Sequence, residues 1–493
     1  MNTETTLHQR IAQLERLLAE KDARLLFLEE QFRLAQQKQF GKSAEGFAGQ
    51  GELFNEVEEI AVLVEAEQQD ISYRRNKPKR NPLPKDLPRE VVVHDISDAE
   101  KVCACCHGQL HKIGEDTSEK LDFIPAQVKV IEHVRPKYAC RECEKTGTSN
   151  PIKQALMPVS PIPKGIATAS LLSQLITSKY QYGLPLYRQE SLFKQYGIAL
   201  SRQTMSDWML KSATLFTPLI KRLKETLRKQ AVIHADETTV NVIKSEKIKS
   251  YMWLYCTGTD SPMPTSSIPN IVLYDYHDSR AGSCVVDYLD GYSGYLQVDG
   301  YQAYHQTQAT LVGCWAHARR KFIEAKQAQP KGKSGKADVA LSYIQKLYGI
   351  ESRFKNATPE ETYEARQTQA KPILDKLHGW FTQQNVLPKN KLGEAITYLS
   401  NQWPKLLGYL EDGRLNIDNN RAERAIKPFV IGRKNWLFSQ TANGADASAA
   451  LYSIIETAKA NGLVPFDYVK QCLDELCKPQ PDIDAILPWN IKR

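Results

Sequence analysis

The hydrophobic positions at the start of the chain repeat with the spacing of a coiled coil. Apolar residues recur at alternating four- and three-residue intervals, at Leu7, Ile11, Leu14, Leu18, Leu25, Leu28, Phe32 and Ala35. Lys21 occupies one core position of this series. Because a polar core residue specifies register or oligomeric state, we predict an oligomerising coiled coil over residues 1–45. The alternative is an amphipathic helix that packs on its own protein.

Charge and proline then replace the hydrophobic repeat. Residues 46–92 begin with an acidic run and continue with a basic run that contains several prolines. Since proline interrupts regular structure, we predict an extended linker. Its basic half would either follow a DNA backbone or remain a solvated linker.

A helix-turn-helix pattern follows in the predicted helical domain 158–229. Amphipathic segments at 170–179 and 186–196 precede a turn at 197–200 and a helix that Ser201 caps. The exposed start of that last helix, the part that enters a major groove, carries Arg202, Gln203 and Ser206. Residues 161–230 hold 11 Lys/Arg and 3 Asp/Glu, a local net charge of +8. This charge favours DNA contact over the alternative, a two-helix corner of an ordinary bundle.

From residue 230 the hydrophobic period becomes that of strands. Three strands are followed by a β-α-β-α order, the order of a ribonuclease-H-like α/β core in which the first and fourth strands are neighbours. The predicted elements are strands at 232–240, 251–257 and 271–276, a helix at 281–289, a strand at 295–298, a helix from Tyr301, a strand at 310–314 and a helix at 316–326. The predicted segments are the first part of the core (230–326), a helical insertion (327–415), the last core helix (416–445) and a C-terminal helical region (446–493).

Three carboxylates occupy related places in this core. Asp236 and Asp299 each end an apolar run, and Glu423 lies in the polar start of a helix. One aspartate after a strand is more often a turn or cap residue, but three in this order can converge on hard divalent cations such as Mg²⁺. Two such ions would activate a water and stabilise the leaving oxygen in phosphodiester chemistry. Glu237 is left out of this set, because neighbouring strand residues point apart.

The cysteines indicate one metal site in a reduced chain. Five of the ten cysteines lie within 103–143, and two Cys-x-x-Cys pairs, Cys103/Cys106 and Cys140/Cys143, supply the four thiolates of a structural zinc site. A strand pair within 121–138 would fill the gap in this domain, which we place at 93–157. Cys105 leaves the ligand choice slightly open, and buried free cysteines are the alternative. The chain lacks both a signal-peptide pattern and a membrane-length apolar run, which favours the cytoplasm.

Basic residues accompany the carboxylates. Those suited to phosphate contact are Arg319, Arg320, Arg424, Lys427, Arg433 and Lys434. Lys427 also lies one helical turn from Glu423, and Arg319 and Arg320 would alternatively pair with an acidic neighbour. His317 is a candidate for phosphate contact or water positioning, or else a structural histidine at a helix start.

Taken together, these stretches resemble transposases of the bacterial insertion sequence 66 family over essentially the whole chain. The matching segments are 83–89, the two cysteine pairs, 234–238, 298–301, 314–322, 418–424 and 432–436. The resemblance implies a DDE recombinase in which Asp236, Asp299 and Glu423 form the catalytic triad and bind Mg²⁺ (or Mn²⁺). It implies terminal-inverted-repeat and target DNA as substrates, and accessory proteins of the element as partners.

The predicted architecture is therefore a multidomain α/β protein in which coiled-coil, zinc-binding and helix-turn-helix modules precede a ribonuclease-H-like core with a helical insertion. The predicted function is transposition by metal-dependent hydrolysis and strand transfer in the bacterial cytoplasm, at the nucleoid. A catalytically silent DNA-binding regulator is the main alternative, because the zinc module, the linker and the helix-turn-helix alone suffice for binding. A metal nuclease that acts on other nucleic acids is a third hypothesis.

Overall fold

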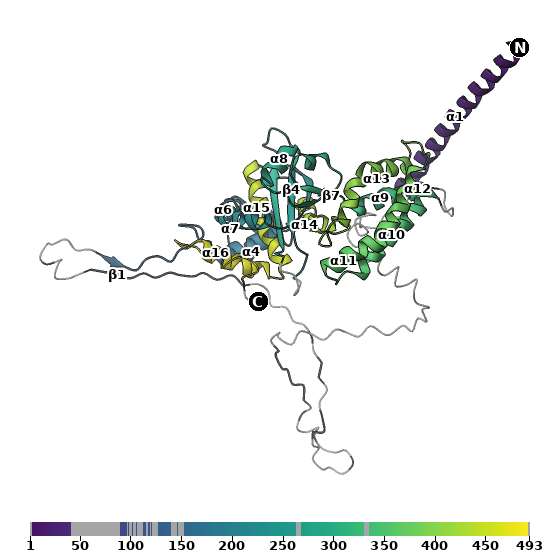
Figure 1. Cartoon of the computed structure of the whole chain (residues 1–493). Helices are drawn as coiled ribbons and strands as arrows, with labels where there is room; N and C mark the ends of the chain where they lie inside the picture. Colours follow the sequence, from purple (N-terminus) through teal and green to yellow (C-terminus); the bar gives the residue numbers. More distant parts are fainter. Residues whose placement is uncertain are drawn as a thin grey trace. The chain divides into compact units, whose positions relative to one another are not determined.

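The computed structural model describes most of the chain in two separate units, 69–155 and the remainder (Figure 1). The four cysteines predicted to bind zinc and residues 46–88 of the predicted linker lie outside the described residues. The described residues are 2–40, 89–95, 97, 101, 105, 112–114, 117–118, 120, 127–139, 145, 152–262, 268–329 and 335–491.

The smaller unit contains a short strand pair. Strand β1 (Lys137–Tyr138) pairs antiparallel with β2 (Lys153–Gln154). Arg135 and the β2 end support the pair, since the Gln154 side chain donates to the Arg135 carbonyl at 2.9 Å. The prediction of a strand pair within 121–138 is wrong for the described residues 127–136, because these residues form no strand. The partner of β1 instead comes from beyond the second cysteine pair.

In the larger unit, the N-terminal heptad lies on one long helix, α1 (Asn2–Phe40). The heptad side chains from Ile11 to Phe32 whose exposure is described are 50–66% exposed. Within the described part of the chain this stripe is left uncovered, whereas the alternative of an intramolecular amphipathic helix requires it to be buried. Among the described helices, none is both long and apolar enough to cross a membrane.

The larger unit is built on a five-stranded sheet with the order β5-β4-β3-β6-β7. Strands β3, β4 and β5 are antiparallel neighbours, whereas β3, β6 and β7 run parallel, so the first and fourth strands of the core are adjacent as predicted. Their bounds are β3 (Val232–Asn241), β4 (Lys249–Thr257), β5 (Ile271–His277), β6 (Tyr295–Gln297) and β7 (Thr310–Val312).

The connections on one side of this sheet are short. Helix α8 (Gly282–Tyr288) follows β5, close to the predicted helix. The expected helix from Tyr301 is instead a 3-10 turn, η2 (Gln302–Gln306). Only residues 298–309 separate β6 from β7, which leaves little chain for a longer helix.

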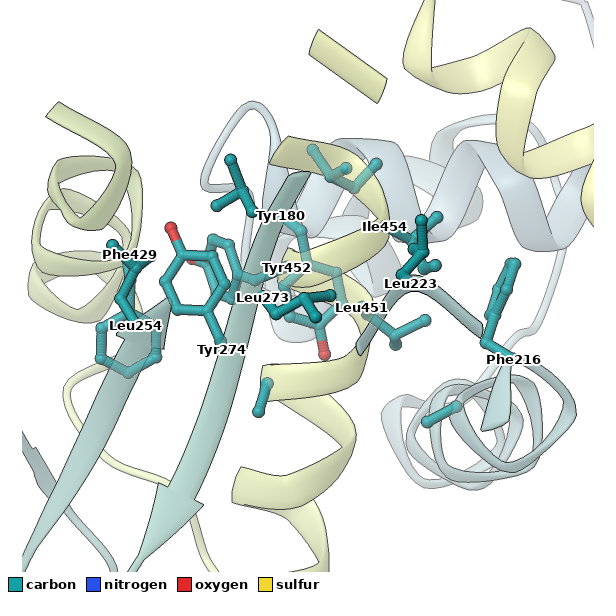
Figure 2. Close-up of a cluster of buried hydrophobic side chains, with 14 of the residues drawn as sticks. Tyr180, Phe216, Leu223, Leu254, Leu273, Tyr274, Phe429, Leu451, Tyr452 and Ile454 are labelled. Atoms are coloured by element: carbon teal, nitrogen blue, oxygen red, sulfur yellow. The ribbon is translucent and has the colours of Figure 1, made fainter. Parts of the chain in front are cut away.

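Two C-terminal helices cover the antiparallel half of the sheet. Helix α14 (Asn420–Trp436) packs on β3 and β4, and α15 (Ala442–Ala460) packs along β5. Figure 2 shows Tyr274 of β5 beside Phe429 and Tyr452 of these helices; Tyr274 lies 6.1 Å from the Phe429 ring centroid and 5.5 Å from that of Tyr452. Hydroxyl groups of α15 also bond backbone groups of β5, which protects this sheet edge from pairing with another chain; the backbone N–H of Tyr274 donates to Ser453 at 2.8 Å.

The helical domain before the sheet has the predicted helix-turn-helix order. Gly197 supplies the turn with a φ of 74°, a conformation that glycine adopts without strain. Ser201 caps the second helix by accepting from the Thr204 N–H at 3.1 Å. The helices of this domain, and the terminal helix that packs on it, are α4 (Ala169–Tyr180), α5 (Leu186–Gln195), α6 (Arg202–Leu215), α7 (Thr217–Leu227) and α16 (Pro465–Leu476).

A helical subdomain lies between β7 and α14, as predicted. It has a buried ion pair at its centre: Arg366 donates to Glu351 at 2.7 Å and to the carbonyl of Leu415 at 2.8 Å. This arginine ties the helices to the segment that returns the chain to α14. The elements are α9 (Trp315–Gln327), α10 (Lys336–Arg353), α11 (Pro359–Ala365), the π-helical turn η3 (Arg366–Ala370), α12 (Lys371–Thr382), α13 (Lys391–Leu407) and the 3-10 turn η4 (Gly408–Leu410).

Candidate active site

The parallel pair β3 and β6 places two of the predicted carboxylates at the same level. His234 is opposite Gln297 in the register, and Asp236 and Asp299 each follow that pair by two residues. Each carboxylate accepts one backbone N–H from a residue close in sequence: Asp236 from Glu237 and Asp299 from Tyr301, both at 2.8 Å. The adjacency predicted from strand order is therefore present.

Asn419 attaches the start of α14 to β3. Its side-chain N–H donates to the Ala235 carbonyl at 2.8 Å, and its amide oxygen lies 3.0 Å from His234 Nδ1. Because that oxygen accepts, Nδ1 of His234 carries the proton. Burial lowers the pKa of His234 to about 4, so the ring is neutral near pH 7. The two contacts of Asn419 hold the first turn of α14 beside Ala235, the residue that precedes Asp236.

Glu423 lies one turn further along α14 and is buried. Residues four apart share a helix face, so Glu423 follows Asn419 on the side of the helix that faces β3. The negative charges of Asp299 and Glu423 both contribute to the raised pKa of Asp236. The structure thus places Asp236 and Asp299 on and just after the paired strands β3 and β6, and Glu423 on the helix that packs on β3; we refer to the three side chains as the carboxylate cluster.

Burial is the main influence on the protonation of Asp236 and Glu423. Burial first, and then the charges of Glu237, Asp299 and Glu423, raise the pKa of Asp236 well above its usual range. Burial also raises the pKa of Glu423 to about 7. Carboxylates that repel one another and lose hydration are stabilised in their charged form by a nearby cation.

Helix α9 supplies the positive and polar groups that contact Glu423. Arg320 Nη2 lies 3.5 Å from Oε2, and His317 Nδ1 lies 3.4 Å from Oε1. These atoms, His317 Nδ1 and Glu423 Oε1, are buried without a hydrogen bond of good geometry. Cys314, at the start of the same helix, also has its sulfur within 4.8 Å of these ligand atoms. The sequence analysis named His317 but not Cys314, although their spacing of three along a helix start was a usable signal.

Glu237 takes part in a separate network. Its Oε2 accepts from the Tyr304 hydroxyl at 2.5 Å, and its Oε1 accepts from Arg280 Nε at 3.1 Å and from Nη2. Burial, followed by the charge of Asp299, raises the pKa of Glu237. Its carboxylate is thus committed to protein donors. Neither Arg280 nor Tyr304 could be predicted from the sequence, because neither lies in a recognisable motif.

Some residues predicted to contact DNA form hydrogen bonds with other residues of the same chain. Arg424 donates to Asp260 at 2.5 Å, and Arg433 donates to Thr238 at 2.9 Å, where it braces α14 against β3. Arg202, Gln203 and Lys434 are exposed, whereas Ser206, Arg319, Arg320 and Lys427 are partly buried. A role in DNA binding stays a prediction for all nine residues.

The chain matches family models over most of its length. Residues 164–447 match the model described as "Transposase IS66 family", and residues 453–489 match "IS66 C-terminal element". Residues 100–144, which include all four predicted zinc ligands, match "zinc-finger binding domain of transposase IS66". Residues 27–92 match "Transposase C of IS166 homeodomain".

Curated relatives are also similar over most of their length. Uncharacterised protein y4jD of Sinorhizobium fredii is 33% identical over 83% of this chain and 81% of its own. Uncharacterised protein y4qI of the same organism is 34% identical over 85% of this chain and 79% of its own. No solved structure matches. The matches to the catalytic, zinc-finger and C-terminal models, together with these relatives, show that the chain belongs to the IS66 family of transposases.

Proposed function

We propose that this chain is a DDE transposase that binds the terminal inverted repeats of its element, hydrolyses a phosphodiester at each end and transfers the freed strand to target DNA. The observation that supports this proposal is the placement of Asp236 and Asp299 on and just after the paired strands β3 and β6, with Glu423 buried on α14, the helix that packs on β3. The strand order β5-β4-β3-β6-β7, with α14 packed on β3, supports a ribonuclease-H-like core.

The donor set fits divalent cations. The three groups are oxygen ligands, which Mg²⁺ and Mn²⁺ prefer. Glu423 Oε1 is a buried acceptor without a hydrogen bond, and Asp236 has a strongly raised pKa. Two bound ions would supply an activated water and stabilisation of the leaving oxygen. Asp236, Asp299 and Glu423 are the residues that would hold them.

The protein's own residues would orient and shield this chemistry. Asn419 and His234 fix the start of α14 against β3, and Glu423 lies one turn further along that helix. Arg320 lies at Glu423 Oε2 and places a positive charge at the edge of the cluster. Hydrolysis joins a water oxygen to phosphorus and releases a 3′-hydroxyl at the element end. That hydroxyl then attacks a target phosphodiester in line, so no serine or tyrosine nucleophile is required.

The test of this proposal is cleavage of a labelled duplex that carries the inverted repeat of the element that encodes the chain. With Mg²⁺ or Mn²⁺ we expect nicking at the element end. Binding without nicking, even when the accessory proteins of the element are added, would favour the silent regulator. Nicking that does not depend on the inverted repeat would favour a general nuclease.

DNA recognition would begin at the helix-turn-helix. Arg202 and Gln203 are exposed at the N-terminal turn of α6, the end that contacts base edges in this motif. Met205 and Trp208 are buried and hold the other face of the helix on its domain. The proposed substrates are therefore inverted-repeat and target DNA in the bacterial cytoplasm.

We expect the zinc-finger region to bind about one zinc ion per chain through Cys103, Cys106, Cys140 and Cys143. The zinc-finger match over 100–144 supports this expectation. Metal analysis of purified protein should show loss of zinc in a Cys140→Ser/Cys143→Ser variant. The control Cys105→Ser should keep its zinc. A folded wild-type protein with less than about half an equivalent would contradict the site.

We expect the exposed stripe of α1 to join copies of the chain as a coiled coil. Leu18 and Leu25 are 66% and 57% exposed, and apolar residues at this spacing pack against a second helix. A Leu18→Lys/Leu25→Lys variant should have a smaller mass by light scattering than wild type. Glu20→Lys, at an exposed position outside the series, is the matched control. An unchanged mass for the double variant would contradict the coiled coil.

A further inference from the structure

Arg280 lies next to the carboxylate cluster and is held in place on two sides. One side is the buried carboxylate of Glu237, whose side chain is 2% exposed. On the other side, the guanidinium lies 3.6 Å from the ring centroid of Tyr301. The Tyr301 hydroxyl donates to the Arg280 carbonyl at 2.8 Å, which fixes the loop as well as the side chain. The orientation of this guanidinium is therefore set before any ligand arrives.

The same contacts connect Arg280 to a predicted catalytic residue. Tyr301, on which the guanidinium stacks, donates its backbone N–H to Asp299 at 2.8 Å. The charge of Asp299 also contributes to the raised pKa of Glu237. Strands β5 and β6 both run parallel to β3. The loop that carries Arg280 and the turn that carries Asp299 therefore follow the C-terminal ends of their strands, on the same side of the sheet's strand ends.

These contacts leave part of the Arg280 side chain exposed to solvent. Its Nε and Nη2 face Glu237, and its side chain remains 40% exposed. A guanidinium presents a fixed fork of donors that matches a phosphate, and preorganisation reduces the entropy lost on binding. The remaining edge of the fork is thus available to an anion at the rim of the site.

We propose that Arg280, held by Glu237 and stacked on Tyr301, contacts a backbone phosphate of the element-end DNA beside the scissile bond. This inference rests on the proposed function and adds a substrate contact to it. Glu237 and Tyr301 are then positioning residues that aim Arg280. This role explains why Glu237, the carboxylate next to Asp236 in the sequence, accepts hydrogen bonds from Arg280 and Tyr304.

The first test is binding of the labelled inverted-repeat duplex over a series of salt concentrations, without Mg²⁺, so that cleavage does not enter. Arg280→Gln removes the charge but keeps a donor for Glu237. We expect about tenfold weaker binding, as for loss of a charged hydrogen bond. The slope of log affinity against log salt should become shallower by about one.

Arg414→Gln is the matched control. Arg414 forms the same kind of paired fork with Asp412, at 3.0 and 2.6 Å, and its side chain is 45% exposed. It lies near Tyr295, at the opposite end of β6 from Asp299. We expect the Arg414 variant to bind DNA as wild type does. An Arg280 variant that behaves like the Arg414 variant, with an unchanged melting temperature, would overturn the inference.

A chemical test identifies the phosphate directly. A methylphosphonate, which is neutral, replaces one phosphate at a time near the cleaved bond. One position should weaken binding by wild type but not by Arg280→Gln, because the contact is already absent in the variant. Equal weakening of both proteins at every position would show that Arg280 only neutralises Glu237.

Two further outcomes are distinguishable. If Arg280→Gln does not fold, Arg280→Lys keeps the positive charge for Glu237 and removes the fork; wild-type affinity and an unchanged methylphosphonate pattern in that variant would overturn the proposal. If wild type itself does not bind the inverted-repeat duplex, the proposed function fails. Wild-type binding with an indifferent Arg280 contradicts only this inference.

Discussion

Replacing Asp236, Asp299 or Glu423 with alanine is expected to abolish metal-dependent cleavage of the inverted-repeat duplex. In the proposed site the three carboxylates would hold the cations jointly, so the loss of any one would remove part of that site. We expect each single variant to lose about a thousandfold or more in cleavage rate, the scale seen when a member of a catalytic unit is removed. The measurement is nicking of the labelled duplex with Mg²⁺ or Mn²⁺.

DNA binding should survive in the same variants. Removing a negative charge lowers repulsion of the DNA phosphates, and it also relieves the repulsion that raises the pKa of Asp236. The variants should therefore fold and bind the duplex at least as tightly as wild type. Asp287→Ala, an exposed acid on α8, is the control for loss of a carboxylate elsewhere and should cleave normally. Full cleavage by any one of the three triad variants would exclude that residue from the triad.

The adjacency of Asp236 and Asp299 could be predicted because it depends on strand order alone. Alternating and apolar runs identified the strands, and a parallel first and fourth strand brings the two positions together. Glu423 could be placed on a helix because the polar start of α14 is followed by a helical pattern. These conclusions use periodicity within a segment and a topological rule, so they require no knowledge of side-chain contacts.

The groups around the triad could not be predicted, because they depend on contacts between distant segments. Arg280 reaches Glu237 across 43 positions, and Arg320 reaches Glu423 across 103. The same reason explains why basic residues near Glu423 suggested DNA contact, although Arg424 is paired with Asp260. A sequence shows the charge of an arginine but does not show which acceptor the fold places beside it.

Local turns and buried polar contacts also escaped the sequence analysis. Asn419 joins α14 to β3 through His234 and Ala235, a contact that the helical pattern around it does not indicate. Arg366 lies in the predicted helical insertion, where it is buried and bonds three carbonyl groups and Glu351. Buried polar side chains of this kind are hydrogen-bonded, but sequence periodicity treats them as surface positions.

The last prediction concerns stability without magnesium, where Glu423→Gln is expected to unfold at a higher temperature than wild type at pH 8. The pKa of Glu423 is raised from 4.5 to about 7, mainly by burial. A carboxyl group with a raised pKa in the folded state stabilises the fold most below pH 4.5, and this contribution is lost as the pH rises through about 7. The loss corresponds to about 3 kcal/mol, or a few degrees in melting temperature.

Glutamine resembles the protonated carboxyl group, so the variant should avoid that loss. The measurement is the melting temperature of both proteins at pH 5 and pH 8, in buffer without added magnesium and without a strong chelator, so that the predicted zinc is retained. The two proteins should melt alike at pH 5 and differ at pH 8. Asp287→Asn makes the same charge change on an exposed residue and should not differ from wild type at either pH.

Magnesium should reverse the difference, because a cation stabilises the ionised carboxylates that destabilise the metal-free protein. At pH 8, added Mg²⁺ should raise the melting temperature of wild type more than that of Glu423→Gln. A wild-type protein that is as stable as the variant at pH 8 without Mg²⁺ would contradict the expectation that ionised Glu423 destabilises the metal-free fold. An equal response of both proteins to Mg²⁺ would mean that Glu423 does not help to hold the cation, whatever the cleavage assay shows for the other two carboxylates.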